Sequence, residues 1–447
     1  MVNAFDIDTV ETLDPGLRRI VKRRADLLGP AYKLFYRNPV RFVRAEGVHL
    51  YDADGQAYLD AYNNVPSVGH CHPRVVEAIA RQAATLNTHT RYASDLVLDY
   101  AERLLATFPA ALGHVMFTCT GSEAVDLALR IARFQAGGDG TLITANAYHG
   151  VTTAAAEISP SLGPGVPLGR PVWTVTPPVP DSDPGLAAPV TAHDAGLAFA
   201  ARVRAAIADM TRHGVTFAAF IADSILSTDG ILPDPAGFLR PVIDAVHEAG
   251  GLYIADEVQS GFARTGDAMW GFQRHGIVPD LVVMGKPMGN GMPIAGVAVR
   301  PEIVAEFGRQ VRYFNTFGGN SVCVAAAAAV LDVVEAEGLQ ENARVVGRYL
   351  LDALVAIADG TPRIGGVRGA GLYAGVDFVE PGTAAPDGDA AIRVVNALRE
   401  RHVLISATGP HGNTLKIRPP LPFATEHVDQ LTAALSDALA TTFHLPA

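Results

Sequence analysis

The chain has 447 residues, of which 49% are hydrophobic and 18% are charged, and its formal net charge is −11. This length exceeds one ordinary hydrophobic core, so we expect two domains, or one large domain with a smaller one attached. The acidic balance and the absence of a basic run argue against nucleic acid or an anionic membrane surface as the main partner.

The amino-terminal stretch MVNAFDIDTVETLDPG is acidic and lacks the apolar segment of a signal peptide. The three cysteines, Cys71, Cys119 and Cys323, are widely spaced and form no CxxC pair, which suits a reducing compartment. No apolar run approaches the length of a membrane span. We therefore expect a cytoplasmic protein.

The first 60 residues predict a short helix leading into an arm, followed by a hairpin. Partial alternation over 40–60 surrounds the pair Asp54-Gly55, which suits a tight turn between strands. Helical spacing follows at 73–86 and 95–108.

Short apolar runs then alternate with helical patterns, which predicts an α/β fold with a mainly parallel sheet and helices on both faces. The expected strands are 114–119, 141–145, 216–223, the two runs that end at Asp256 and Lys286, and 294–299. The expected helices of this region are 123–135, 197–212 and 238–250. Between them, 160–189 is rich in proline, glycine and serine and predicts a long surface loop or a lid, whose role stays open.

The pattern changes after Phe314, where two helices are expected at 320–337 and 341–358. A smaller α+β region follows, with strands predicted in GLYAGVDF, VLISAT and TLKIRP, and with GVRGAG at 366–371 as a turn into a strand. We place a large cofactor-binding domain at 61–325 and a small carboxy-terminal domain at 326–447. Residues 1–60 form an arm and hairpin that join the small domain.

Two of the apolar runs end on residues of opposite charge, Asp256 and Lys286. Parallel strands deliver polar residues at their carboxyl ends, where ligands bind. A lysine amine can bond to the aldehyde of pyridoxal 5′-phosphate, and an acid can pair with its ring nitrogen. Either residue alone is also typical of a solvated loop.

Other residues fit the same cofactor. The turn CTGSEA opens a helix, so the N–H groups of Gly121 and Ser122 favour an anion there, although an ordinary helix cap explains the motif equally well. Tyr148 follows a strand and could stack on a ring. Thr316, in a glycine-rich turn, could donate to a phosphate, or be a simple turn residue.

His70-Cys71-His72 has no further ligands at useful spacing, so we expect no metal.

The motifs GSEA, AYHG, ADEVQSGFARTG, MGKPMGNG and NTFGGN, in this order, resemble the class III aminotransferase family of fold type I pyridoxal-phosphate enzymes. The resemblance covers about Leu34 to the end. It implies that Lys286 carries the cofactor and that Asp256 holds its ring nitrogen. It also implies a homodimer with active sites at the interface, without deciding whether dimers pair into tetramers. The other implied cofactor contacts are Val258 and Tyr148 on the ring faces, Gln259 at the ring hydroxyl, Gly121 and Ser122 at the phosphate, and Thr316 from the partner subunit.

Within this family the chain resembles one branch more narrowly, the ethanolamine-phosphate and phosphohydroxylysine phospho-lyases. The stretches that carry this resemblance are LFYRNPVRFVRA, LDAYNNVPSVGHCHP and TLKIRPPL. Many relatives have an arginine three residues before Pro-Pro as a carboxylate clamp. Here Lys416 stands there, with Arg418 beside the prolines, and lysine lacks the planar fork but suits phosphate.

The leading interpretation is a carbon–oxygen lyase that eliminates phosphate from a phosphorylated amine, O-phosphoethanolamine. The candidate substrate residues are Asn63, Asn64, Arg91, Lys416 and Arg418. The alternatives are an aminotransferase that passes an amine to pyruvate or 2-oxoglutarate, and a pseudoenzyme that only binds the cofactor.

Overall fold

The computed structural model describes residues 3–178 and 191–444. Its largest sheet has seven strands in the order β4-β10-β9-β8-β7-β5-β6. Only β10 runs antiparallel to its neighbours, so the predicted mainly parallel sheet is confirmed. The strands are β4 (His114–Thr118), β5 (Gly140–Thr144), β6 (Val172–Val175), β7 (Phe217–Asp223), β8 (Leu252–Asp256), β9 (Leu281–Met284) and β10 (Ala295–Val299).

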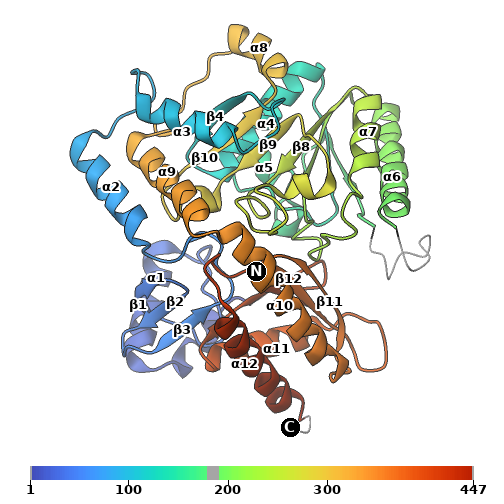
Figure 1. Cartoon of the computed structure of the whole chain (residues 1–447). Coiled ribbons are helices and arrows are strands. Elements are labelled where there is room, and N and C mark those ends of the chain that lie inside the picture. The colour runs from blue at the N-terminus through green and yellow to red at the C-terminus, as the bar shows by residue number, and fades with distance from the viewer. Residues whose placement is uncertain (1–2, 179–190, 445–447) are drawn as a thin grey trace.

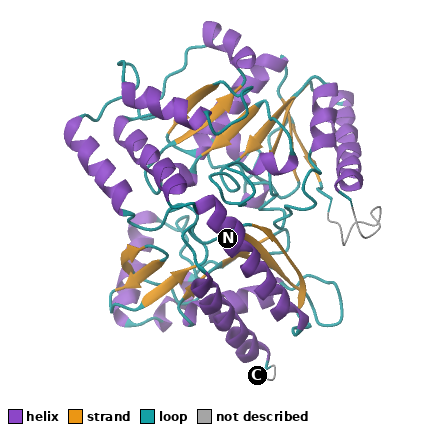
Figure 2. Cartoon of the chain, in the orientation of Figure 1, coloured by secondary structure: helices purple, strands orange, loops and turns teal. Residues whose placement is uncertain are grey.

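Both faces of this sheet are covered, which explains why its strands are continuous apolar runs. Successive side chains point to opposite faces: Ile254 packs with one cluster of buried residues, and Tyr253 and Ala255 pack with the other. One face carries α4 (Gly121–Ala136) and α8 (Pro301–Gln310). The opposite face carries α3 (Asp95–Leu105), α6 (Ala192–Arg212), α7 (Arg240–Glu248) and α9 (Ser321–Ala336). Figure 2 shows these helices around the sheet.

Two four-stranded sheets lie below the large one in Figure 1. The first contains the predicted hairpin, with Gly55 at φ +85° in its turn, and ends on a strand from the far end of the chain. Its order is β1 (Phe42–Glu46), β2 (His49–Asp52), β3 (Ala57–Asp60) and β13 (Val403–Leu404). The second sheet has the order β11 (Ile364–Ala370), β12 (Tyr373–Phe378), β15 (Thr414–Ile417) and β14 (Ser406–Thr408).

The remaining helices pack around these sheets and along the edge of the large one. None of the helices within the described ranges is long and apolar enough to cross a membrane. They are α1 (Pro15–Leu28), α2 (Pro73–Thr85), α5 (Thr153–Ala156), α10 (Leu339–Asp359), α11 (Gly388–Glu400) and α12 (Thr425–Phe443), with short 3₁₀ turns η1 (Ile7–Thr12), η2 (Pro160–Leu162), η3 (Gly271–His275) and η4 (Lys286–Gly289).

Three sequence predictions need correction. The stretch 160–189 is not one loop, because it contains η2 and β6, which pairs with β5 at the sheet edge; residues 179–189 lie outside the described part. VLISAT is not one strand, because the chain passes from β13 in one sheet to β14 in another. GVRGAG is not a turn into a strand, because its first five residues belong to the strand β11, and Gly371 begins the turn that follows. The boundaries at 60 and 325 stay a prediction.

Three glycines let the large-sheet region approach α10 closely. A Cβ on Gly266 would lie 2.6 Å from backbone atoms of Arg344. A Cβ on Gly347 would lie 2.2 Å from the carbonyl oxygen of Gly371, and a Cβ on Gly371 would lie 2.4 Å from the backbone of Thr265. Real Cβ atoms do not come this close, so larger residues would push these backbones apart.

Candidate active site

The polar residues at the carboxyl edge of the large sheet come from three neighbouring parallel strands. In the register, Asp223 at the end of β7 pairs with Asp256 at the end of β8, and Asp256 pairs with Val283 of β9. Lys286 follows three residues later. The expected meeting of the acid and the lysine at one edge is therefore present.

Asp256 is 5% exposed and is held by two donors. The imidazole Nδ1 of His149 lies 2.7 Å from its Oδ2, and the N–H of Val258 donates to Oδ1 at 3.1 Å. Because a carboxylate only accepts, the His149 proton lies on Nδ1. The other nitrogen, Nε2, is buried and has no hydrogen-bond partner within the described ranges.

Sequence reasoning did not assign this role to His149. Its only signal is its position next to Tyr148, after a strand. Two donors fix the direction of the carboxylate, which suits a permanent partner for a ring N–H.

We predict that replacing His149 with leucine lowers kcat between about tenfold and a hundredfold, since a hydrogen bond to a charged group is worth about 1.5–3 kcal/mol. KM should change little, because His149 acts through Asp256. His149→Asn keeps an N–H near the position of Nδ1 and should restore much of the rate. Steady-state kinetics of both variants checks this; equal losses would reduce His149 to a packing role.

Burial lowers the pKa of Lys286 to about 8, the nearby charge of Arg418 acts in the same direction, and Asp256 opposes it. A lysine in water keeps its proton at this pH. A large share of Lys286 is therefore uncharged at mildly alkaline pH, as a nucleophilic or proton-accepting amine requires.

We expect the cofactor-free protein to bind pyridoxal phosphate faster as the pH rises, with a midpoint at about 8 and a constant rate well above it, because only the uncharged amine attacks an aldehyde. Stopped-flow absorbance between about pH 6.5 and about pH 10 measures this. Arg418→Met removes a positive charge and should move the midpoint upward. A wild-type midpoint near the ordinary value of 10.5 would contradict the prediction.

The amino end of α4 forms an anion cradle beside this lysine. Thr120 caps the helix together with Glu123, which leaves Gly121 and Ser122 in its first turn. Gly285, next to Lys286, faces the Gly121 backbone so closely that a Cβ on it would lie 3.5 Å away. The Ser122 hydroxyl accepts the N–H of Val151 at 3.0 Å, so its own hydrogen remains free to donate.

These residues fit pyridoxal phosphate. Three groups that the cofactor requires lie at one edge of the sheet. The lysine with the lowered pKa suits the aldehyde, the fixed carboxylate suits the ring nitrogen, and the helix amino terminus suits the phosphate. Val258 is 8% exposed and packs over Gly121, and Tyr148 is 36% exposed with a ring that no hydrogen bond holds in the described structure.

Gln259 joins two predicted substrate residues. Its Oε1 accepts hydrogen bonds from Asn64, at 3.2 Å, and from the guanidinium of Arg418. Arg418 also donates to the carbonyl of Tyr62 at 3.0 Å and packs 4.8 Å above the Tyr62 ring. The buried Oδ1 of Asn64 has no partner among the described residues, so this amide can still accept from a ligand.

Lys416 is 7% exposed and stands 5.8 Å above the ring of Tyr373. Within the described ranges it has neither an ion pair nor a side-chain hydrogen bond, and the buried Tyr373 hydroxyl is also unpaired. Burial and the charge of Arg418 hold the pKa of Lys416 well below its ordinary value. Arg264, fully buried nearby, has its pKa lowered to about 9 for the same two reasons. Asp223 opposes the shift at Lys416. The region therefore gathers several buried basic side chains whose charges disfavour one another.

The other predicted site residues have different contacts. Asn63 accepts the N–H of Val65 at 3.1 Å, which holds a turn after Asp60. Arg91 is exposed and stacks 3.6 Å above Phe314. Thr316 is exposed and lines a surface cavity of about 560 Å³. None of the three forms a hydrogen bond or an ion pair with Lys416 in the described structure, and their roles in substrate or cofactor binding stay predictions.

The histidines of the HCH motif have other partners. His70 pairs with Asp60 at 2.7 Å, and His72 pairs with Glu337 at 3.0 Å. Over the described ranges, no three His, Cys, Asp or Glu side chains cluster in a way that could hold a metal ion.

Comparison with known proteins decides the family. The profile of the family described as aminotransferase class-III matches residues 34–439, which is most of the chain. The chain belongs to the class III aminotransferase family. The fold type I architecture and the pyridoxal-phosphate cofactor follow from this membership and from the solved relatives.

Relatives of this class III enzyme include proteins named for different reactions. One is the alanine–glyoxylate aminotransferase 2-like protein of Drosophila melanogaster, 40% identical, covering 94% of this chain and 88% of the relative. Another is the ethanolamine-phosphate phospho-lyase homolog 1 of Caenorhabditis elegans, 39% identical, covering 94% and 93%. An Arthrobacter phospholyase, solved in complex with phosphoethanolamine, is 45% identical with a TM-score of 0.90, covering 96% and 100%.

Proposed function

We propose that this class III enzyme is a phospho-lyase that converts O-phosphoethanolamine to acetaldehyde, ammonia and inorganic phosphate. The observation that carries the proposal is the buried pair Lys416 and Arg418, which has no carboxylate partner among the described residues. A buried charge is costly unless a counter-ion accompanies it. Burial and the neighbouring Arg418 hold the pKa of Lys416 low in the free protein, and a phosphate dianion is the ligand that best offsets Arg418 together with a protonated Lys416.

Two of the relatives support this reading. The Arthrobacter enzyme was solved with phosphoethanolamine, and the nematode relative carries the phospho-lyase name. In this chain the residue three before Pro419-Pro420 is Lys416, which lacks the planar fork of an arginine carboxylate clamp but remains a good point charge for phosphate.

The residues of this chain would divide the work as follows. Arg418 and Lys416 bind the substrate phosphate, with Arg418 positioned by Gln259 and the Tyr62 carbonyl. Bound pyridoxal phosphate withdraws electrons from the carbon beside the substrate nitrogen. The Lys286 amine accepts the proton from that carbon, while Asp256, fixed by His149, holds its negative charge at the ring nitrogen. The two cations stabilise the departing phosphate, and water then releases ammonia and acetaldehyde.

An aminotransferase is the second candidate, because the Drosophila relative at 40% identity carries an aminotransferase name. It would use the same cofactor residues, with Lys416 and Arg418 holding the carboxylate of an amino or keto acid.

The test mixes cofactor-loaded protein with O-phosphoethanolamine and no keto acid. We expect phosphate and acetaldehyde in equal amounts over many turnovers, with the cofactor spectrum unchanged. Neither product, together with conversion of the cofactor to its amine form by alanine, would assign the protein to the aminotransferases. Binding of the cofactor without turnover of either substrate would favour a pseudoenzyme.

We also propose a cytoplasmic homodimer. The exposed position of Thr316, in a cavity that also has Phe317 and Asn87 in its walls, supports its donation to the cofactor phosphate of a second subunit. Arg91, stacked on Phe314 of the same segment, would then serve the partner's site.

A further inference from the structure

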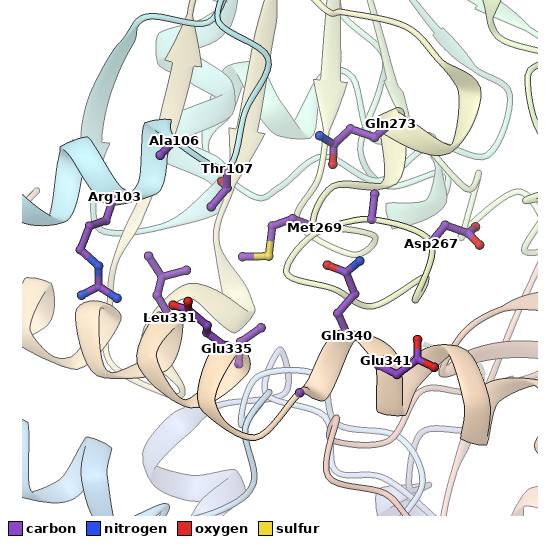
Figure 3. A pocket seen from close by; sticks show the side chains of 13 residues that line it. Arg103, Ala106, Thr107, Asp267, Met269, Gln273, Leu331, Glu335, Gln340 and Glu341 are labelled. Atoms are coloured by element: carbon purple, nitrogen blue, oxygen red, sulfur yellow. The ribbon is translucent and has the colours of Figure 1, made fainter.

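A cavity of about 810 Å³ lies away from the cofactor residues, and none of the predicted site residues lines it. Three elements surround it: the carboxyl end of α3, the loop 267–273 that follows the cofactor motif, and the junction of α9 and α10 (Figure 3). It therefore touches both the large-sheet region and the helix that leads away from it.

The charges around this cavity are unequal. Asp267, Glu335 and Glu341 are three carboxylates, and Arg103 is the one guanidinium or ammonium among the lining residues. Arg103 is already paired with Asp332 at 2.6 Å.

The three carboxylates differ in whether an ion pair neutralises their charge. Asp267 pairs with Arg274, and Glu341 pairs with Arg344 at 2.5 Å. Glu335 is exposed and has no ion pair in the described structure. The cavity therefore keeps a negative charge without a counter-ion.

The walls between these charges are apolar or neutral. Met269 and Leu331 point into the space in Figure 3, and Val334 also lines the cavity. Gln340 and Gln273 face it from two sides; the Gln273 oxygen accepts the N–H of Trp270, which leaves its amide hydrogens free. A ligand that matches this lining has a cationic head and an apolar body.

We propose that this cavity is an effector site for a small organic cation with a short apolar chain. The cationic group lies at Glu335, and the chain lies on Met269 and Leu331. The site is independent of the reaction proposed above.

The loop 267–273 connects this site to the cofactor. The Trp270 indole donates to the Thr107 hydroxyl, which lines the cavity, at 2.9 Å. The N–H groups of Gly271 and Phe272 donate to the carboxylate of Glu257 at 2.6 and 2.9 Å, and Glu257 follows Asp256 directly. A bound cation, with its head at Glu335 and its chain on Met269, would bridge this loop and the carboxyl end of α9.

The binding test uses calorimetry of the holoprotein with butyltrimethylammonium. This probe has no N–H and cannot combine with the cofactor aldehyde, and the cationic active site repels it. Hexanoate, of similar size and opposite charge, is the control ligand. We expect saturable binding of one cation per chain and no binding of hexanoate. No cation binding, or equal binding of hexanoate, would overturn the proposal.

Three variants locate the site. Glu335→Gln should weaken binding about fivefold, as expected for one partly exposed charge contact. Ala106→Trp should abolish binding by filling the cavity. The matched control Glu102→Gln removes an exposed carboxylate of α3 that does not line the cavity, and should bind as the wild type does. Unchanged affinity in both Glu335→Gln and Ala106→Trp would place the ligand elsewhere.

An optical signal gives an independent readout. The chain has two tryptophans, Trp173 and Trp270, and Trp270 lies behind the cavity wall. In a Trp173→Phe background the cation should change Trp270 emission with the calorimetric dissociation constant. Emission that does not respond to the bound cation would contradict the link to this loop.

Discussion

Replacing Lys286 with alanine is expected to abolish product formation, with a loss of at least about a thousandfold, because one amine both holds the cofactor and moves the proton. The protein should remain folded, since Lys286 has no ion pair or side-chain hydrogen bond in the described structure. Turnover of the variant at the wild-type rate would show that Lys286 is not the base.

The sequence provides a clean control for this assignment. The chain has four lysines, Lys22, Lys33, Lys286 and Lys416. Borohydride reduction of the holoprotein followed by peptide mapping should place the cofactor on Lys286 alone. Lys33→Ala, which removes an exposed lysine of the amino-terminal arm, should keep both the label and the activity.

Replacing Lys416 with methionine is expected to lower kcat/KM for O-phosphoethanolamine about a hundredfold, because a hydrogen bond to a charged group is worth about 1.5–3 kcal/mol. Methionine keeps most of the apolar length of the side chain. Competitive inhibition by inorganic phosphate should weaken by a similar factor, which gives a second measure of phosphate binding.

Thermal stability separates this role from a structural one. Lys416 is buried without an ion pair, and burial holds its pKa well below the ordinary value, so replacing its amine with a thioether removes a polar group that contributes no ion pair to the fold. The melting temperature of Lys416→Met should equal or exceed that of the wild type. A lower melting temperature with unchanged phosphate inhibition would mean that Lys416 supports the fold and not the substrate.

The sequence predicts the cofactor edge well because its signals are local. Short apolar runs that end at Asp256 and Lys286 give both the strands and their polar ends, and parallel pairing brings the ends together. Gly121 is equally visible, since a strand-to-helix turn fixes its position.

The remaining features depend on distant pairings that a linear pattern does not contain. Gln259 and Arg418 meet across 159 positions, and Arg264 donates to the carbonyl of Pro419 across 155. The strand β11 is hidden by its own glycines, which normally mark turns. Asn63 has the right residue type for substrate binding, but the turn after Asp60 uses its side chain.

The pairing of β3 with β13 has a consequence for how the chain folds. Leu59 and Val403 are register partners, although about 340 residues lie between them. During synthesis the strands β1–β3 therefore emerge long before β13 has been made. The edge of β3 stays unpaired until nearly the whole chain has been synthesised. Closing so long a loop is entropically unfavourable and slow. Folding intermediates should thus contain the large sheet while the amino-terminal hairpin is still exchanging its amide hydrogens freely.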